Sequence, residues 1–181
     1  MTYELRLATE HDIPELRELI PFAARALSVG YYAEPQVGSM IRHAIGVDSQ
    51  FIADGTYFVV ADTERIAGCG GWNKRATLYG GDRSKGESDP LLDPATDAAR
   101  IRAFFVHPDP VRRGIGRRLI ETCEDAAREA GFSRMELGTT LPGEPLYAAM
   151  GYTATDRFDI ALPDGEMLPS AHMIKSLEQD N

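Results

Sequence analysis

Residues 101–131 constrain the fold more than any other part of the chain. An apolar run, IRAFFVH, ends at a proline and leads through a turn that contains Gly114 and Gly116. Apolar residues then recur every three or four positions over 115–130, and Gly131 follows them. This order predicts a strand, a glycine turn and an amphipathic helix that ends at a glycine cap. A chain organised around such a unit folds as an α/β or α+β layer structure.

The rest of the chain alternates between strand and helix patterns. Helices are expected after Thr9, where Asp12 completes a capping-box pattern, after Pro35, and over residues 144–150. Period-2 or β-branched runs, several of them bounded by turn residues, predict strands at 3–7, 56–61, 65–72, 135–141, 152–161 and 172–177. The two runs around residues 62–64 form a hairpin signature. The expected architecture is therefore a strand-rich sheet with helices on it.

One long segment fits neither pattern. Residues 76–99 are rich in Gly, Asp, Ser and Pro and are too long for a plain connector. They are either a lid over a site or an ordinary surface insertion.

Composition excludes several classes of protein. With 181 residues, 43% apolar and 26% charged, the chain is expected to form one globular domain over residues 1–181. The net charge of −9 disfavours nucleic acid and anionic membranes as partners and favours the approach of cationic ligands. Cys69 and Cys123 lie in apolar segments, and no apolar run is long enough for a membrane span. We expect a soluble, reduced, cytoplasmic protein.

The turn before the helix is a candidate anion site. Backbone N–H groups at a helix start converge on one point, and glycines let a phosphate approach the main chain. Four arginines add a local basic patch: Arg112, Arg113, Arg117 and Arg118. The alternative is that the glycines only shape a tight loop and the arginines are solvated. Leu119 stands where a dinucleotide fingerprint needs its third glycine, and no Gly-Lys-Ser or Gly-Lys-Thr is present for a P-loop.

The sequence resembles the GNAT superfamily of acetyl-CoA-dependent N-acetyltransferases. FFVHPDPVRRGIGRRL matches the family's strand, proline turn, glycine loop and helix, with Val111 where Gln or Arg is usual. Tyr147, Gly151 and Tyr152 repeat a second family pattern, with Leu146 in place of an aromatic residue. The resemblance covers nearly the whole chain in order.

The resemblance implies a mixed, mostly antiparallel sheet of six to seven strands flanked by helices. The sheet would splay beside 104–106, and acetyl-CoA, the acetyl donor, would lie in the gap. The implied cofactor-binding residues are Phe104, Val106, Arg112, Arg113, Gly114, Ile115, Gly116 and Arg117. Tyr147 corresponds to the family tyrosine that protonates the departing thiolate. Its alternative role is that of a buried, merely satisfied aromatic residue.

The acceptor side is less defined. An amine of small-molecule or peptide origin is implied, and deprotonating an alkylammonium at pH 7 costs about 4 to 5 kcal/mol. The glutamate that the family often carries on this strand has no counterpart in 100–103, so the conceivable proton acceptors are Glu136, Glu144, His107 and His43. The resemblance also places Tyr31, Tyr32, Trp72 and Asn73 in regions that line the acceptor pocket. Their aromatic rings would form a rim for an ammonium, and all four residues are equally well explained as core and rim packing.

Several alternatives stay open. The competing class is a non-catalytic CoA-binding or regulatory module. O-acetylation and transfer of a longer acyl group remain possible reactions. A homodimer is an open possibility. The isolated histidines and the two cysteines show no metal-ligand spacing, so no metal is expected.

Overall fold

The computed structural model describes residues 3–82, 89–109 and 114–178. Their strands form one seven-stranded sheet in the order β1-β2-β3-β4-β5-β7-β6. The strands are β1 (Glu4–Leu7), β2 (Tyr57–Ala61), β3 (Ile66–Asn73), β4 (Ala99–Val106), β5 (Arg134–Thr140), β6 (Thr153–Ala161) and β7 (Met167–Ser176). Only β4 and β5 pair in parallel, and all other neighbours are antiparallel. The mixed, mostly antiparallel sheet expected from the sequence is confirmed.

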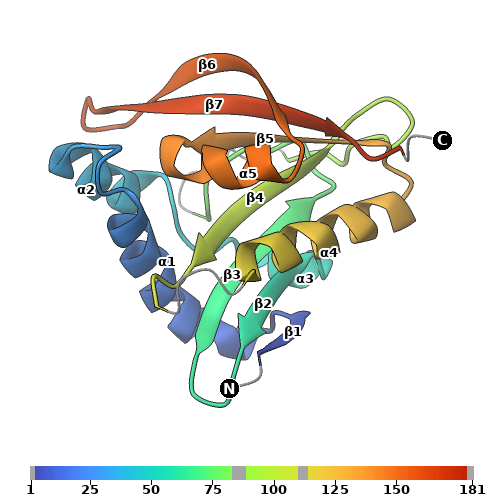
Figure 1. The fold of residues 1–181 in the computed structure, drawn as a ribbon, viewed down its shortest axis with the longest axis horizontal. Helices are drawn as coiled ribbons and strands as arrows, with labels where there is room; N and C mark the ends of the chain where they lie inside the picture. Colours follow the sequence, from blue (N-terminus) through green and yellow to red (C-terminus); the bar gives the residue numbers. More distant parts are fainter. Residues whose placement is uncertain (1–2, 83–88, 110–113, 179–181) are drawn as a thin grey trace.

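Helices cover both faces of this sheet. They are α1 (Ile13–Leu27), α2 (Glu34–His43), α3 (Ser49–Asp54), α4 (Ile115–Glu129) and α5 (Glu144–Ala149), with short 3₁₀ turns at Glu10–Asp12 and Leu141–Gly143. In Figure 1, α4 and α5 lie on the near face. They pack on β4, β5 and β7 around Ile101, Met135 and Met173. On the opposite face α1 and α3 pack on β2 and β3, and α2 packs on α1 and β7.

The sheet splits at its centre. β4 and β5 pair only at Ala99 with Met135 and at Arg100 with Glu136. Beyond these pairs the two strands separate, so the remaining residues of β4 have no strand beside them on the β5 side. This divergence positions the cavity described below.

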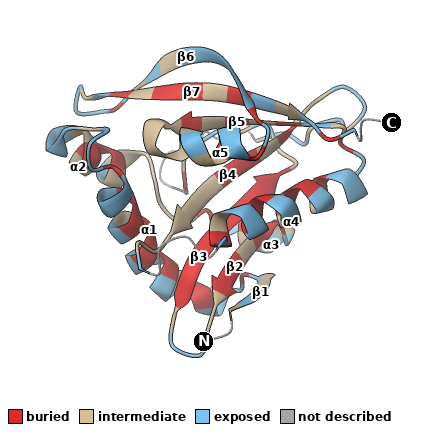
Figure 2. Cartoon of the chain, viewed as in Figure 1, coloured by how far each residue is buried: buried red, intermediate tan, exposed pale blue. Residues whose placement is uncertain are grey.

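Three glycines of β3 bring the layers close together. β3 is buried along its whole length (Figure 2). A Cβ at Gly68 would lie 2.7 Å from Ile115 of α4, and one at Gly70 would lie 2.6 Å from the Phe104 ring. A Cβ at Gly71 would lie 2.7 Å from the Tyr57 ring. The GCGG run therefore lets one helix and two aromatic rings sit directly on the strand backbone.

Most element predictions hold, and the differences have local causes. The Thr9–Asp12 capping box is present, but it closes a 3₁₀ turn, and α1 begins at Ile13. Gly131 follows α4 with φ +91°, as expected of a helix-ending glycine. The prediction missed α3, and it placed the start of β7 five residues late because β7 pairs with β6 from Met167 onward.

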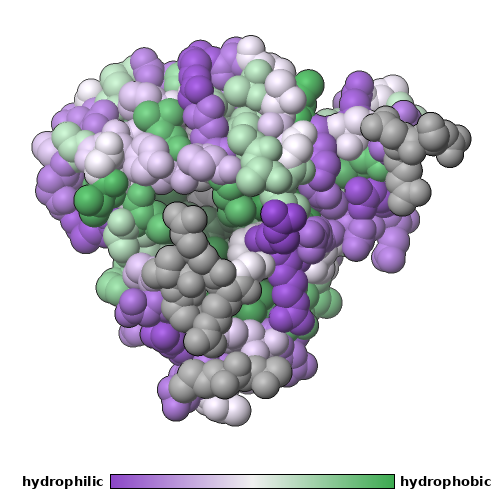
Figure 3. Space-filling view, in the orientation of Figure 1, coloured by the Kyte–Doolittle hydropathy of each residue, from purple (hydrophilic) through white to green (hydrophobic). Residues whose placement is uncertain are grey.

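The visible surface is mixed in character. In Figure 3 hydrophobic and hydrophilic residues are interspersed over the face shown, and Figure 2 shows exposed residues along the outer side of α4. Within the described ranges, every helix is too short or too polar to span a lipid bilayer.

Candidate active site

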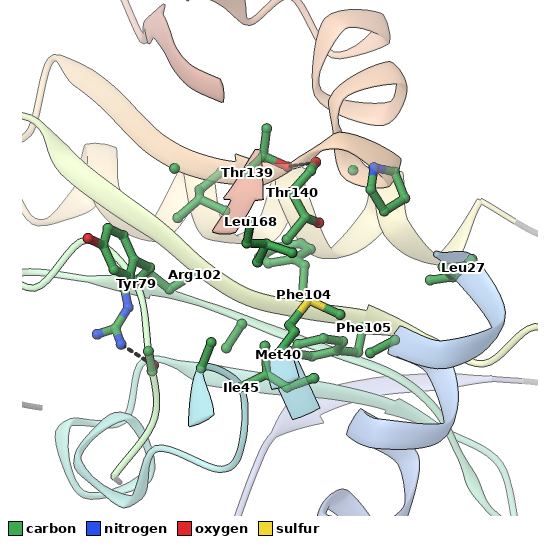
Figure 4. Close-up of a pocket in the computed structure, with 18 of the residues that line it drawn as sticks. Leu27, Met40, Ile45, Tyr79, Arg102, Phe104, Phe105, Thr139, Thr140 and Leu168 are labelled. Carbon is green, nitrogen blue, oxygen red and sulfur yellow. Dashed lines mark hydrogen bonds between the residues drawn. The ribbon is translucent and has the colours of Figure 1, made fainter. Parts of the chain in front are cut away.

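A cavity of about 310 Å³ occupies the gap between β4 and β5. Its walls come from α1, α2, the 44–46 and 78–80 loops, the diverging strands, α5 and the β6–β7 pair (Figure 4). Leu146 and Tyr147 line it on the α5 side, and Met40 and Ile45 line it on the opposite face of the sheet. The cavity thus crosses the sheet and is reached by groups from both layers.

The backbone of β4 faces this cavity at Phe104 and Val106. His107 N donates to Ala67 O of the β3 side at 2.9 Å. Because backbone groups alternate in direction along a strand, those of Phe104 and Val106 point the other way, toward β5. No β5 residue pairs with them in the described sheet. These two residues therefore present strand-edge hydrogen-bonding groups to the cavity.

A β-bulge shapes this part of β4. The β3–β4 register shifts between Cys69 and Gly71, and Ala103 has φ +56°, a left-handed conformation that is rare for a residue with a side chain. Tyr57 Oη donates to Ala103 O at 2.9 Å and supports the distorted turn of the strand. The bulge changes which backbone groups point toward β5 from Phe104 onward.

The start of α4 forms the second predicted element. Gly114 is the N-cap residue with φ +73°, and its carbonyl accepts from Arg118 N at 2.9 Å. The N–H groups of the first helical residues, Ile115, Gly116 and Arg117, have no carbonyl of a preceding helical turn to bind. A Cβ at Gly114 would meet no described atom within 4 Å, so no described side chain packs against this glycine.

The structure separates the roles of the two glycines and of the arginines. Gly114 has a positive φ, and Gly116 does not. Gly116 lies inside α4, where a Cβ would come 2.8 Å from Leu146 Cδ2, so this glycine lets α5 pack closely against α4. Arg117 is largely exposed, and Arg118 donates to Tyr3 O at 3.0 Å. Arg112 and Arg113 lie outside the described residues.

Tyr147 lies where α5 meets β4. Its ring packs edge-on against Phe104 and Tyr152, with centroid distances of 6.1 and 5.7 Å. The side chain lines the cavity while only 6% of the residue is exposed. Burial, and to a lesser degree the neighbouring Cys123, raises the pKa of Tyr147 well above its ordinary value. The phenol is therefore held in its protonated, hydrogen-bond-donating form.

The four residues considered for an acceptor rim do not line the described cavity. Trp72 is buried in the core edge-on to Phe132, and Asn73 holds the following turn by accepting from Arg75 N at 3.0 Å. Tyr31 is about half exposed and does not line the cavity. Tyr32 Oη donates to Pro169 O at 2.6 Å and accepts from Leu141 N at 2.9 Å, which ties the α1–α2 connection to β7 and to the end of β5.

None of the four conceivable proton acceptors lines the cavity. Glu136 pairs with Arg100 and with His172 on the strands, and Glu144 forms an ion pair with Arg157. His107 lies against Phe22 and Arg65, and His43 lies 3.5 Å from Asp164. Each of these side chains has a local structural partner instead.

The sequence analysis did not predict the residues that line the cavity on the side away from α5. Arg102 is buried, with its side chain 1% exposed, and forms an ion pair with Asp48 at 3.3 Å. It also donates to Gly80 O, next to Tyr79, which lines the cavity (Figure 4). The only available signal was an arginine inside an apolar strand, and its partner lies 54 positions earlier in the chain.

The segment 76–99 is partly a cavity wall. Leu78, Tyr79 and Gly80 line the cavity. Arg75 anchors the segment through Asp54 at 2.7 Å, and Thr77 N donates to Asp89 at 2.8 Å. These residues form one side of the cavity, and residues 83–88 of this segment lie outside the described part of the chain.

The cysteines do not participate in the site. Both are buried thiols, and burial raises the pKa of Cys69 to about 12. Over the described ranges, no three His, Cys, Asp or Glu side chains are grouped so as to hold a metal ion.

Comparisons with known proteins agree on one family. A model of the acetyltransferase (GNAT) family matches residues 23–152. No curated protein matches the sequence.

Solved structures show the same fold at low identity. A GCN5-related N-acetyltransferase from Rhodopseudomonas palustris is 21% identical, with a TM-score of 0.71 over 97% of this chain and 96% of that one. The PaiA N-acetyltransferase of Thermoplasma acidophilum, in complex with coenzyme A, is 13% identical with a TM-score of 0.66 over 97% and 99%. YncA of Salmonella typhimurium, with its cofactor acetyl-CoA, is 18% identical with a TM-score of 0.65 over 100% and 97%. With the family match over more than half of its length, this chain belongs to the GNAT family of acetyltransferases.

Proposed function

We propose that this protein moves the acetyl group of acetyl-CoA to an amine by direct attack in a ternary complex. The observation that carries the proposal is the cavity between β4 and β5, which crosses the sheet and opens the β4 backbone to a ligand. The amine nitrogen attacks the thioester carbonyl carbon, the C–S bond breaks, and the thiolate and an amide are formed. The amine proton leaves to solvent or a carrier, and the thiolate takes up a proton.

We assign acetyl-CoA, the acetyl donor, to the edge of β4 that faces the cavity. Phe104 and Val106 would bind the pantetheine arm through their backbone groups, in the manner of an added strand. The N–H of Val106 would also stabilise the oxyanion of the tetrahedral intermediate. The unpaired edge of β4 supports both roles.

The pyrophosphate is assigned to the start of α4. Gly114, Ile115, Gly116 and Arg117 would receive it, with the free N–H groups and the positive end of the helix as the main source of affinity. Arg112 and Arg113 belong to the same proposed site as side-chain contacts. The open space at Gly114 supports this placement.

Tyr147 is assigned to the leaving thiolate. A cysteine-like thiol has a pKa of about 8.5, so a thiolate leaves without full protonation. Because the pKa of the Tyr147 phenol is raised well above that value, the phenol stays protonated and stabilises the developing thiolate as a hydrogen-bond donor. The released thiolate then takes its proton from solvent, and the phenol keeps its own.

The wider setting is also a proposal. We place the activity in the cytoplasm, in a single domain formed by residues 1–181, with no nucleic acid or membrane as partner. The cavity walls supply no local negative charge to focus cations, because no Asp or Glu is present among the described lining residues. The net charge of −9 therefore gives no selectivity for a cationic acceptor inside the site.

The competing proposal is a CoA-binding module without turnover, favoured by the absence of a carboxylate or imidazole from the described cavity wall. Thiol release from acetyl-CoA, measured with and without a panel of amines, separates the two. Amine-dependent release with formation of the acetylated amine supports transfer. Calorimetric binding of CoA without any release supports the module, and no binding at all contradicts both.

A further inference from the structure

We infer that the acceptor is an apolar molecule whose nucleophilic amine is weakly basic, so that the amine is already largely neutral when it binds. This inference rests on the proposed acetyl transfer and specifies its acceptor. It comes from the part of the cavity that lies on the α1–α2 side of β4 and β5.

The walls on this side are mostly apolar. They are formed by Leu27, Met40, Ile45, Leu78, Ile160 and Leu168 (Figure 4). These side chains come from α1, α2, the two loops, β6 and β7, so the acceptor is enclosed by hydrocarbon from several directions. A charged ammonium placed there loses its hydration without gaining a carboxylate, which is unfavourable.

The described lining offers no group that accepts a proton near pH 7. Its ionisable members are Tyr79, Arg102 and Tyr147, and its other polar side chains are hydroxyls such as Thr139 and Thr140. A phenol and a guanidinium are protonated at neutral pH, and an alcohol does not act as a base there. As far as the described lining is concerned, the neutral amine is therefore supplied by the acceptor itself.

Arg102 makes the environment less favourable for a cation. Its guanidinium lies over the Phe51 ring at 4.8 Å and is paired with Asp48, so its charge is partly balanced. Two of its nitrogens, Nε and Nη1, are buried and have no hydrogen-bond partner among the described residues. Because these nitrogens are enclosed by protein, the contribution of Arg102 to the cavity wall is its positive charge, which disfavours an ammonium nearby.

The basicity of the amine decides how much of it is reactive. An alkylamine with a lysine-like pKa of about 10.4 is neutral in roughly one molecule of 2,500 at pH 7. An α-amine next to a carbonyl, with a pKa of about 7.7 to 8.0, is neutral in roughly one molecule of ten. An arylamine is less basic still. A cavity whose described walls hold no base consequently favours the weakly basic amines.

A pair of isomers tests this directly. 4-Ethylaniline and 2-phenylethylamine have the same atoms and similar apolar bodies, but the first is a weakly basic arylamine and the second an alkylamine. We expect kcat/KM at pH 7 to be at least about tenfold higher for 4-ethylaniline, after allowing for its lower intrinsic nucleophilicity. Phenylalaninamide, measured beside them, reports whether an α-amine next to a carbonyl is preferred to the arylamine.

The pH dependence distinguishes the acceptor from the enzyme. Between pH 6.5 and 8.5, kcat/KM for 2-phenylethylamine should rise about tenfold per pH unit, because its neutral fraction rises in that proportion. For 4-ethylaniline it should stay nearly constant. If both profiles level off at the same pH, an enzyme base is present and the inference is wrong.

Leu78→Glu and Leu78→Gln form a matched pair of variants. The first adds a carboxylate to the cavity wall, and the second adds a neutral side chain of similar size. We expect the glutamate variant to improve kcat/KM for 2-phenylethylamine relative to 4-ethylaniline by at least tenfold, and the glutamine variant to leave that ratio unchanged.

The outcomes separate this inference from the proposed function. Preferred acetylation of spermidine or another polar alkylamine keeps the transferase function and overturns the apolar, weakly basic acceptor. Absence of thiol release with every amine, polar amines included, overturns the transferase function itself. The measurements on the unmodified protein decide the question even if a Leu78 variant fails to fold.

Discussion

The ring of Tyr147 stands edge-on to the ring of Phe104, with their centroids 6.1 Å apart and their planes at 64°. Phe104 in turn fits over Gly70, where no side chain blocks it. The phenol is therefore positioned by contacts that run from Gly70 of β3 through Phe104 of β4 to α5. These packing contacts place it beside the backbone of β4.

Removing the hydroxyl of Tyr147 should slow the reaction and leave the donor bound. Tyr147→Phe keeps the ring contacts, so we expect acetyl-CoA affinity within a few-fold of the original and a kcat lower by roughly 10 to 10³-fold. Stopped-flow or quenched measurements of a single turnover check the chemical step. Unchanged single-turnover rates would reduce Tyr147 to a packing residue.

Binding of the donor should stabilise the fold. At a free acetyl-CoA concentration of about 100 times Kd, the stabilisation is roughly 2.7 kcal/mol, which corresponds to about 5 to 10 °C in Tm for a chain of this size. Differential scanning calorimetry at several concentrations measures the shift. A Tm that does not respond to acetyl-CoA would contradict the proposed donor.

Gly114 allows the anion site to be tested with a matched control. Gly114 and Gly165 have φ of +73° and +90°, and at neither would a Cβ meet a described atom within 4 Å. An alanine at either position is strained by about 1 kcal/mol. We expect only Gly114→Ala to weaken acetyl-CoA binding, by about tenfold, since loss of a charge-assisted hydrogen bond costs roughly 1.5 kcal/mol or more. Calorimetric Kd values that change equally in both variants would argue against this site.

Gly70 should be intolerant of a side chain. A Cβ there would lie 2.6 Å from the Phe104 ring, so Gly70→Ala should displace the ring and destabilise the fold by roughly 1 to 3 kcal/mol. Gly46→Ala is the control, because a Cβ at Gly46 meets nothing within 4 Å and its φ is not positive. Urea unfolding of both variants measures the difference. Equal midpoints would show that the contact between β3 and β4 relaxes freely.

Asp12 should make the stability of the fold depend on acid pH. Its carboxylate accepts from Arg6 at 2.7 and 2.8 Å and from Thr9 N at 2.7 Å, and these bonds lower its pKa to about 2. Because the folded pKa is below the unfolded value of about 3.9, the stabilisation is complete at neutral pH and is lost as pH falls from about 4 to 2.

Asp12→Asn measures this contribution. We expect the variant to be less stable by about 1 to 2 kcal/mol at pH 7, with the difference disappearing near pH 2. Glu10→Gln, at an exposed position of the same turn, should change little at either pH. Denaturant midpoints across pH 2 to 7 give the comparison, and a difference that persists at pH 2 would assign the effect to lost packing.

Local patterns predicted most of the fold. The segment 101–131 predicted β4, the glycine turn and α4, since a strand, a cap and a helix period are all written in consecutive residues. The six residues of α3 escaped because so short a helix has no measurable period. The start of β7 escaped because its first residues are defined by pairing with β6 and not by their own pattern.

The candidate site was only half predictable. Phe104, Gly114 and Tyr147 follow motifs along the chain. The acceptor side depends on contacts between distant segments, such as Arg102 with Asp48 and with Gly80. Trp72 and Asn73 could not be assigned to core or cavity from the sequence because both environments suit an apolar strand end, and the structure places them in the core.

The short β4–β5 contact gives the sheet the mechanics of two plates joined along one seam. Two residue pairs make that seam at the Ala99 end, and at the far end Tyr32 holds both Leu141 N and Pro169 O. Tyr32 does not act alone at that end, because Gln36 donates to Met167 O at 2.8 Å and both Ser39 and Arg42 donate to Asp164. The far end of the gap is thus bridged by α2 and the connection before it, so the opening available to a ligand depends on where this one helix is packed.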